Sequence, residues 1–323
     1  MLFRSPHDGP TYLYDADTPR LLATPKHFAY IKIAEGCDYT CAFCIIPTLR
    51  GEYRSRDIDS IVREAEALAA EGVQEVLLIS QDSSFFGLDR KERGALATLL
   101  RRLNDVPGLT WIRMLYLYPT TITDDVLDAM AECAKVCKYI DLPLQHASDA
   151  VLKRMKRPGS RRKYDELLRR IQAREPGVSL RTTFIVGFPG ETESEFRELL
   201  DWLEIAQLDR VGAFKYSPVE GARANDAGVH IAPEVQEERL SRFMERAQQI
   251  SAARLARRVG RTETVLVDVV EGNVAIARSR GDAPEIDGIV RITRGGKLPV
   301  GEFAQVKITG ADAYDLKAVP NAN

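Results

Sequence analysis

A chain of 323 residues with a formal net charge of −2 is longer than one ordinary domain, so two domains are the first expectation. Hydrophobic residues make up 45% and charged residues 28%, which is typical of a globular protein, and the pI of about 6.2 gives no bulk attraction to nucleic acid. The sequence has no apolar run long enough to cross a bilayer, and its first residues lack the apolar core of a signal peptide. We therefore expect a cytoplasmic protein with no membrane partner, in which clustered cysteines indicate metal binding or catalysis rather than disulfides.

Residues 1–25 are rich in proline and show no periodicity, which predicts a linker or arm. From residue 26 onward, short β-rich runs alternate with stretches of helical spacing. The predicted strands cover residues 28–33, 75–79, 111–115, 139–142, 180–186 and 210–214. The predicted helices lie near residues 58–71, 95–103, 123–134, 161–173 and 193–205, and Thr192 with Glu195 forms a capping-box pattern before the last of them.

Six β-then-α units in a row predict an α/β fold with a parallel sheet and helices outside it. Six units are fewer than the eight of a full barrel, so an open partial barrel and a doubly wound sheet both remain possible. In either fold, ligands bind beyond the carboxyl ends of the strands. The segment 37–44 follows the first strand directly and is therefore the predicted catalytic loop.

The end of the chain has a different pattern. A long helix is predicted over residues 233–258, followed by β-rich runs at 264–270, 273–278, 288–293 and 305–309 that Gly, Pro and Asp separate. These short strands predict a small all-β barrel. We therefore divide the chain into an arm (1–25), an α/β domain (26–256) and a β-barrel domain (257–323).

Three of the five cysteines, Cys37, Cys41 and Cys44, have the spacing C-x3-C-x2-C. Three thiolates so close in sequence can hold three corners of an iron–sulfur cube and leave the fourth iron open for chemistry. A structural zinc knuckle or three buried thiols are the alternatives, but the next histidine, His146, is far from the motif. The remaining Cys133 and Cys137 are predicted to be buried small hydrophobic residues rather than ligands.

The cysteine motif, with Phe43 at its aromatic position, resembles the signature of the radical S-adenosylmethionine (SAM) enzymes. The resemblance implies a partial (βα)6 barrel and a 4Fe–4S cluster held by Cys37, Cys41 and Cys44, with SAM on the open iron. It also implies an electron donor such as flavodoxin or ferredoxin. In that superfamily, reductive cleavage of SAM gives a 5′-deoxyadenosyl radical that removes a hydrogen atom from an unactivated carbon.

Neighbouring sequences are similar to the methylthiotransferase branch of that superfamily: IAEGC at 33–37, IIPTLRG at 45–51, SQD at 80–82 and TFIVGFPGE at 183–191. The predicted C-terminal barrel resembles the TRAM domain of this branch, an OB-like barrel. DLPLQH at 141–146 and RSRGDAPEIDG at 278–288 are similar to the RimO group, which modifies an aspartate of small-subunit ribosomal protein S-twelve.

The resemblance therefore implies a transferase that adds a methylthio group to the β-carbon of that aspartate, acts on the ribosomal protein as its partner and is a monomer. The nearly balanced charge of the barrel suits docking to a basic ribosomal protein. Two alternatives stay open: a tRNA adenosine methylthiotransferase, and a non-catalytic module that binds zinc and RNA.

The resemblance also implies cofactor contacts, and each has a structural alternative. Phe43, Gln81 and Asp82 are expected near SAM, although Gln81 and Asp82 could equally cap a loop. Gln145, with His146, is expected near ribose or substrate, or in a structural hydrogen bond. Gly187 lets backbone approach the adenine or simply forms a turn. No catalytic residue is assigned beyond the cluster ligands.

Basic residues near these motifs are predicted to lie on solvated faces. They are Arg50, Arg54 and Arg56 after the cysteine motif, and the basic run at 153–163, which contains Arg157. The alternatives are that one of the three arginines meets the carboxylate of SAM or of the substrate, and that the basic run faces ribosomal RNA.

Methylthiotransferases of this branch have an N-terminal domain with three more cysteines that hold a second cluster. This chain has no such domain, so we expect it to hold one cluster and to cleave SAM without completing methylthiolation.

Overall fold

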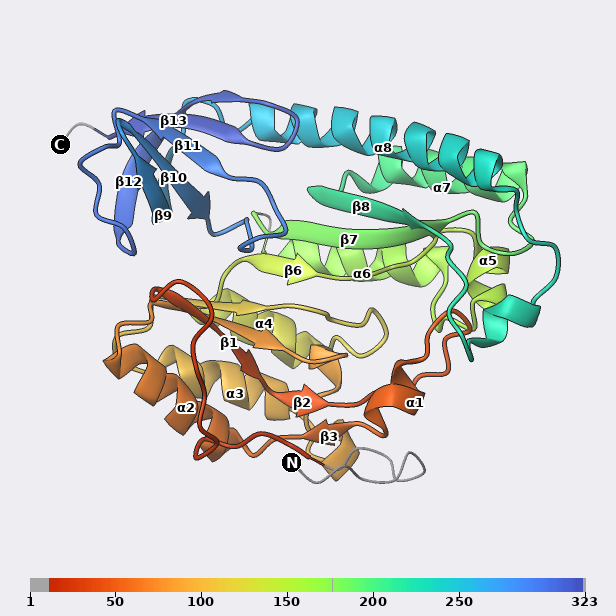
Figure 1. Ribbon diagram of the computed structural model, residues 1–323, viewed down its shortest axis with the longest axis horizontal. Helices are drawn as coiled ribbons and strands as arrows, with labels where there is room; N and C mark the ends of the chain where they lie inside the picture. Colours follow the sequence, from red (N-terminus) through yellow and green to blue (C-terminus); the bar gives the residue numbers. More distant parts are fainter. Residues whose placement is uncertain (1–11, 176, 322–323) are drawn as a thin grey trace.

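A computed structural model describes residues 12–175 and 177–321, and a curved sheet of six parallel strands forms its centre (Figure 1). Strands β1 (Phe28–Lys32), β4 (Glu75–Ile79) and β5 (Trp111–Met114) pair in that order, and β6 (Tyr139–Asp141), β7 (Ser179–Val186) and β8 (Arg210–Lys215) form the second half. A parallel bridge between Ile112 and Val136 and a hydrogen bond from Leu117 N to Asp141 O (2.8 Å) connect the halves. The strands follow one another without a reversal of order, so the partial barrel is confirmed and the doubly wound alternative is wrong.

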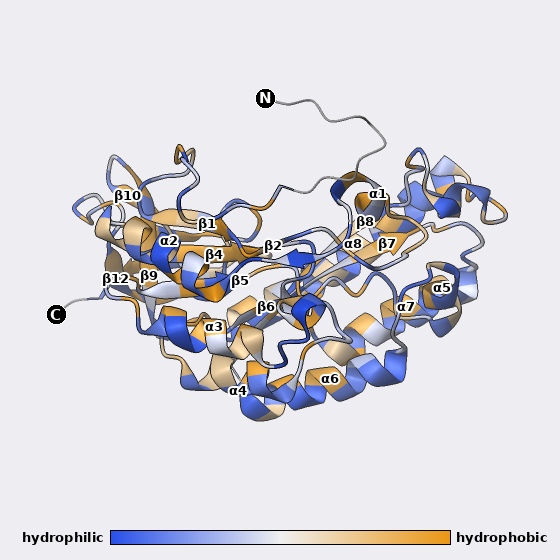
Figure 2. Cartoon of the chain, turned by 90° about the horizontal axis from the view of Figure 1, so that it is seen from below, coloured by the Kyte–Doolittle hydropathy of each residue, from blue (hydrophilic) through white to orange (hydrophobic). Residues whose placement is uncertain are grey.

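Helices cover the outer face of this sheet. They are α2 (Ile58–Ala70), α3 (Ala95–Asn104), α4 (Asp124–Glu132), α6 (Arg161–Arg174), α7 (Glu193–Ala206) and α8 (Pro233–Ala256). Figure 2 shows α3, α4 and α6 with hydrophobic residues on part of their surface and hydrophilic residues on the rest. Along β1, Ala29 and Ile31 pack into the core with the helices, whereas Phe28 and Tyr30 face the inside of the barrel.

A closed five-stranded barrel follows α8, with strand order β10-β11-β13-β12-β9. Its strands are β9 (Thr262–Glu271), β10 (Val274–Ser279), β11 (Val290–Thr293), β12 (Phe303–Ala311) and β13 (Leu316–Pro320). The all-β barrel is confirmed, but the sequence predicted only four of its strands. The prediction missed β13, whose short alternating pattern at Leu316 and Ala318 ends in a proline.

Several short elements also had no periodic signal in the sequence. They are the paired strands β2 (Ala34–Glu35) and β3 (Arg54–Ser55), the helices α1 (Ile46–Arg50) and α5 (Asp149–Arg154), and 3-10 turns at Ser83–Phe85, Leu88–Arg90 and Arg223–Asp226. Of the predicted arm, residues 12–25 contain no helix or strand, and Ala16 N donates to Ser60 Oγ of α2 (3.0 Å). Residues 1–11 of the arm lie outside the described part. None of the described helices has the length and apolar character to span a membrane.

The C-terminal barrel packs against the amino ends of the parallel strands (Figure 1). The ring of Trp111, at the start of β5, meets the ring of Phe303 with 4.7 Å between centroids. Glu75, at the start of β4, accepts from Arg113 (2.8 Å) and from Arg278 of the C-terminal barrel (2.5 Å), and all three side chains are buried. The predicted cysteine loop follows β1 and therefore lies at the opposite, carboxyl end of the strands, away from the C-terminal barrel.

Candidate metal and cofactor site

The cysteine loop, residues 36–45, runs between β2 and α1 and is fixed at both ends. Cys37 N donates to Gly51 O (3.1 Å), and Ala42 N donates to Met155 O (2.8 Å) just after α5. Gly36 has a φ of 92°, and a Cβ there would overlap the backbone oxygen of Glu52. The loop therefore requires glycine where it leaves β2.

Cys37, Cys41 and Cys44 line one pocket of about 370 Å³, which we call the cluster pocket. Its other lining residues are Tyr39, Phe43, Ile46, Ser80, Gln81, Tyr116, Leu117, Tyr118, Pro143, Gln145 and Arg157. Three predicted ligands and three of the predicted cofactor residues, Phe43, Gln81 and Gln145, are thus brought together. The pocket combines soft sulfur ligands with apolar and amide walls, which suits a metal cluster beside an organic cofactor.

The thiols of the cluster pocket are partly or fully buried. Burial raises the pKa of Cys37 to about 11 and also raises the pKa of Cys44. Thiols in this state bind a metal only by losing their protons, and a cation of high charge supplies the compensation. Among the residues that the structure describes, no three His, Cys, Asp or Glu side chains converge closely enough to hold one ion. Each thiolate of a cluster binds a different iron, so three cysteines that line one pocket could hold a cluster without converging on a single ion.

Arg157 is a pocket residue that the sequence analysis assigned to a solvated face, and that assignment is wrong. Only 8% of it is exposed, and its guanidinium lies 3.7 Å from the centroid of the Tyr118 ring. Tyr39 stacks on the other side of Tyr118 at 3.9 Å. Arg157 Nη1 lies 3.9 Å from Cys41 Sγ, and Nη2 donates to Pro143 O (2.5 Å). The break in the basic run at Pro158 and Gly159 is the signal that could have separated Arg157 from a helix face.

The chemistry of the residues that line the cluster pocket fits a cluster with SAM. Three cysteine thiols supply the metal donors, and the buried guanidinium of Arg157 lies beside one of them, where it can compensate the negative charge of a thiolate.

Gln81 and Asp82 follow β4 but face different surroundings. Gln81 lines the cluster pocket, where its Oε1 accepts from Gly36 N (2.9 Å) and its Nε2 donates to Glu35 Oε1 (3.2 Å). Asp82 is buried behind the wall and caps the turn that follows, accepting from Ser84 N (2.9 Å). Burial raises the pKa of the Asp82 carboxyl. The capping interpretation accounts for Asp82, and Gln81 is the residue that faces the pocket.

After β6 and β7, too, one predicted residue lines the cluster pocket and the others do not. Gln145 lines the cluster pocket with a φ of 73°, whereas His146 is fully buried and its Nδ1 accepts from Ser148 N (2.9 Å). Gly187 has a φ of 69°, and a Cβ there would lie 2.5 Å from Cγ of Gln236. The side chain of Gln236 thus covers the backbone of Gly187, and the turn accounts for the glycine.

The remaining sequence predictions concern basic residues and cysteines outside the pocket. Arg56 is buried rather than solvated, because it pairs with Glu64 (2.6 Å), whereas the side chain of Arg50 is 53% exposed. Cys133 and Cys137 are buried among apolar residues, as predicted.

A second pocket of about 500 Å³ adjoins the cluster pocket. Both pockets are lined by Phe43, Tyr116, Pro143 and Gln145. The adjoining pocket extends over the inner face of β7 and β8, where Arg181 and Lys215 are its cationic residues. The arrangement places a second binding volume directly beside the three cysteines.

Two family profiles match the chain. The Radical SAM superfamily matches residues 31–203, and the TRAM domain matches residues 259–320. These matches, with the partial barrel and the cysteine pocket, define a radical SAM enzyme with a C-terminal TRAM barrel.

Relatives narrow the class further. The chain is 50% identical over 305 residues to "Ribosomal protein uS12 methylthiotransferase RimO" of Stenotrophomonas maltophilia (strain K279a), covering 91% of this chain and 67% of that protein. It is 49% identical over 321 residues to the RimO of Azoarcus sp. (strain BH72), covering 97% and 72%. The chain belongs to the RimO family of methylthiotransferases and spans about two thirds of the length of these relatives. Among solved structures, it is similar to the radical SAM methyltransferase TsrM of Kitasatospora setae, with a TM-score of 0.49 and 21% identity over 58% of this chain and 34% of that chain.

Proposed function

We propose that this chain is the radical SAM and TRAM part of an enzyme that adds a methylthio group to the β-carbon of an aspartate of ribosomal protein uS12. The relatives that carry this name share about half of its residues. The observation that carries the proposal is the cluster pocket, where the three cysteines adjoin a second pocket large enough for part of a substrate. In this proposal the arm is 1–25, the radical SAM domain is 26–256 and the TRAM domain is 257–323.

One 4Fe–4S cluster would be held by Cys37, Cys41 and Cys44, with SAM beside it. The lining residues Phe43, Gln81 and Gln145 would contact SAM, and Asp82 would hold the turn that follows Gln81. When bound, the cluster and SAM supply the removal of a hydrogen atom from an unactivated carbon.

The protein's own residues prepare the site for this chemistry. Gln81 fixes the start of the cysteine loop through its bond to Gly36 N. The stack of Tyr39, Tyr118 and Arg157 closes one wall against water and brings a positive charge to Cys41. Phe43 lies between the two pockets and would separate cofactor from substrate.

Arg181 and Lys215 line the adjoining pocket, but carboxylates already compensate their charge. Arg181 pairs with Asp141 (2.6 Å) and lies 3.5 Å from Asp287, and Lys215 pairs with Glu237 (2.5 Å). These side chains could donate hydrogen bonds to a substrate residue without giving the pocket a large net positive charge. We further propose a monomer in the cytoplasm that receives electrons from a flavodoxin or ferredoxin.

The test begins with anaerobic reconstitution of the chain with iron and sulfide. We expect one cluster per chain, broad absorbance near roughly 400 nm and release of 5′-deoxyadenosine from SAM. Cys41→Ala should lose all three signals, whereas Cys133→Ala, a buried cysteine outside the pocket, should retain the cluster. Retained 5′-deoxyadenosine formation by Cys41→Ala would contradict the assignment.

The substrate is tested separately, by mass spectrometry of uS12 and of tRNA from cells lacking the gene. Loss of a methylthio group from uS12 supports the proposal. Its loss from tRNA adenosine instead would reject the protein substrate while leaving the cluster assignment intact.

A further inference from the structure

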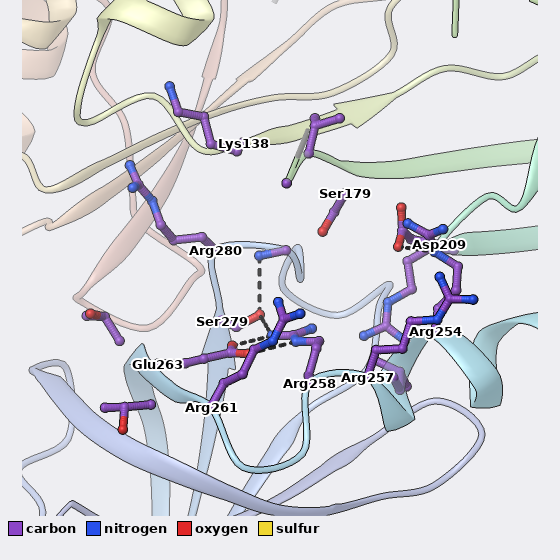
Figure 3. Close-up of a pocket in the computed structure, with 17 residues that line it drawn as sticks. Lys138, Ser179, Asp209, Arg254, Arg257, Arg258, Arg261, Glu263, Ser279 and Arg280 are labelled. Carbon is purple, nitrogen blue, oxygen red and sulfur yellow. Dashed lines mark hydrogen bonds and ion pairs between the residues drawn. The ribbon is translucent and has the colours of Figure 1, made fainter. Parts of the chain in front are cut away.

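A third cavity, of about 590 Å³, lies at the seam between the two domains, at the other end of the strands from the cysteines. We call it the arginine pocket. It is lined by seven cationic and two acidic side chains: Lys138, Arg210, Arg254, Arg257, Arg258, Arg261, Arg280, Asp209 and Glu263. Figure 3 shows Arg254, Arg257, Arg258 and Arg261 on one side of it and Lys138 and Arg280 on the other.

Four of these cations have acidic partners. Arg254 pairs with Asp209 (2.5 Å) and Lys138 with Glu175 (3.7 Å). Arg258 pairs with Glu263, and Arg210 pairs with Asp282. These pairs hold the walls and leave little charge for a ligand.

The other three cations have no acidic partner in the part of the chain that the structure describes. The side chains of Arg257 and Arg261 are exposed, and neither guanidinium makes a hydrogen bond or ion pair with a described residue. Arg280 donates from Nη2 to backbone oxygens of Ala134 and Val136, and its buried Nε has no partner within the described ranges. The arginine pocket therefore carries uncompensated positive charge.

Helix geometry explains only part of this cluster. Arginines are favoured at a helix carboxyl end because of the helix dipole, which accounts for Arg254 and Arg257 at the end of α8. It does not account for Arg261 before β9, Arg280 after β10 or Lys138 before β6. Cations from separate chain segments that converge on one cavity repel one another unless an anion binds among them.

The shape of the cavity also suits a ligand. Its volume is within the usual range for small-molecule sites. Gly281 and Ser179 both line it, and a Cβ at Gly281 would overlap the Ser179 hydroxyl, so glycine lets these two wall segments from different domains pack closely. Guanidinium groups recognise phosphate oxygens through paired hydrogen bonds, and arginine is the preferred side chain for this contact.

We propose that the arginine pocket binds clustered phosphate groups, with Arg257 and Arg261 as the contacting side chains. Such groups are present in a free polyphosphate and in an RNA backbone. The site is separate from the cluster pocket, so its test does not depend on the methylthiotransferase activity.

The experiment measures binding of inorganic tripolyphosphate to the 323-residue chain by isothermal titration calorimetry, and of a short single-stranded RNA by fluorescence anisotropy. We expect at least one probe to bind, with affinity that falls as salt rises. The double variant R257A/R261A should weaken that binding by about tenfold or more, because it removes two charged hydrogen-bond donors.

The matched control is R291A/K307A, which removes two exposed cations of the same domain that do not line the pocket. It should bind as the unmodified chain does, and thermal unfolding should show both variants to be folded. Tripolyphosphate binding alone identifies a compact ligand, and RNA binding alone identifies a nucleic-acid backbone. The proposal is overturned if neither probe binds, or if R257A/R261A binds as tightly as the control.

Discussion

At the scale of single residues, Arg157 is the side chain that most changes the electrostatics of the cluster pocket. Its guanidinium is buried between the Tyr118 ring and the thiol of Cys41, where water screens its charge poorly. A positive charge beside a cluster ligand favours the reduced state, because reduction adds an electron nearby. We therefore expect Arg157 to tune a cluster held by Cys41 rather than to act as a catalytic residue.

We predict that Arg157→Gln lowers the midpoint potential of the reconstituted cluster. Arg157→Lys should have a midpoint potential close to that of the unmodified chain, because the positive charge remains. A redox titration followed by electron paramagnetic resonance measures this directly. Arg162→Gln, which removes an exposed charge from α6, serves as the control and should leave the potential unchanged. An Arg157→Gln potential equal to that of the control would show that the residue only fills space.

Those residues of the cluster pocket that belong to a local sequence pattern could be predicted from the sequence. Cys37, Cys41, Cys44 and Phe43 form one motif, and Gln81 and Gln145 each follow a predicted strand. Arg157 has no such pattern, because its place depends on how the turn after α5 packs on Tyr118. The role of Gln236, which covers Gly187 from α8, depends on tertiary packing in the same way.

At the scale of elements, the long strands and helices were predictable because their apolar residues repeat with a clear period. The pair β2 and β3 contains only Ala34–Glu35 and Arg54–Ser55, which is too short for any period. Yet this pair closes the base of the cysteine loop, and Gly36 lies at the point where the loop leaves it. Its stability therefore matters more to the site than its length suggests.

We predict that Gly36→Ala lowers both the cluster content after reconstitution and the thermal stability. Gly72→Ala is the matched control: Gly72 has a similar φ of 95°, but a Cβ there would meet nothing within 4 Å. The control should cost only the conformational penalty of about 1–2 kcal/mol, and its cluster content should be normal. Iron and sulfide analysis with thermal unfolding compares the two, and equal cluster content in both variants would contradict a role for the close approach to Glu52.

At the scale of the whole molecule, ionic contacts join the two domains at the end away from the cysteines. Glu75 lies between Arg113 of the same sheet and Arg278 of the β-barrel, and Asp268 binds both Arg278 (2.8 Å) and His27 (2.8 Å). Since these charges are buried, loss of one partner leaves another without compensation. The seam is thus more sensitive to substitution than the exposed surface.

We predict that Glu75→Gln destabilises the chain by about 3–5 kcal/mol, because it leaves two buried arginines without their shared carboxylate. The control, Glu132→Gln, breaks the exposed pair with Arg101 and should cost less than about 1 kcal/mol. Chemical denaturation measures both values. Similar losses in the two variants would mean that the buried network contributes no more than a surface pair.

The same network makes stability depend on pH through Asp268. Burial alone would raise the pKa of Asp268, but the hydrogen bond from His27 and the charge of Arg278 outweigh burial and hold the pKa below its ordinary value. A carboxyl with a lowered pKa in the folded state stabilises the fold above its unfolded pKa of about 3.9. That contribution is lost as the pH falls through the folded pKa.

Asp287, in the same seam, has a pKa that burial raises, so its contribution changes with pH in the opposite direction. A melting curve of the unmodified chain mixes the two effects, but the difference between that chain and Asp268→Asn isolates Asp268. We predict that Asp268→Asn is less stable at pH 7 and that the gap in melting temperature closes as the pH falls below about 4. Asp312→Asn, at an exposed pair with Lys317, should show little gap at any pH. A difference in melting temperature between the unmodified chain and Asp268→Asn that stayed constant from pH 7 to pH 3 would contradict this prediction. It would mean that Asp268 stabilises the contact between the domains by its shape or packing and not by its charge.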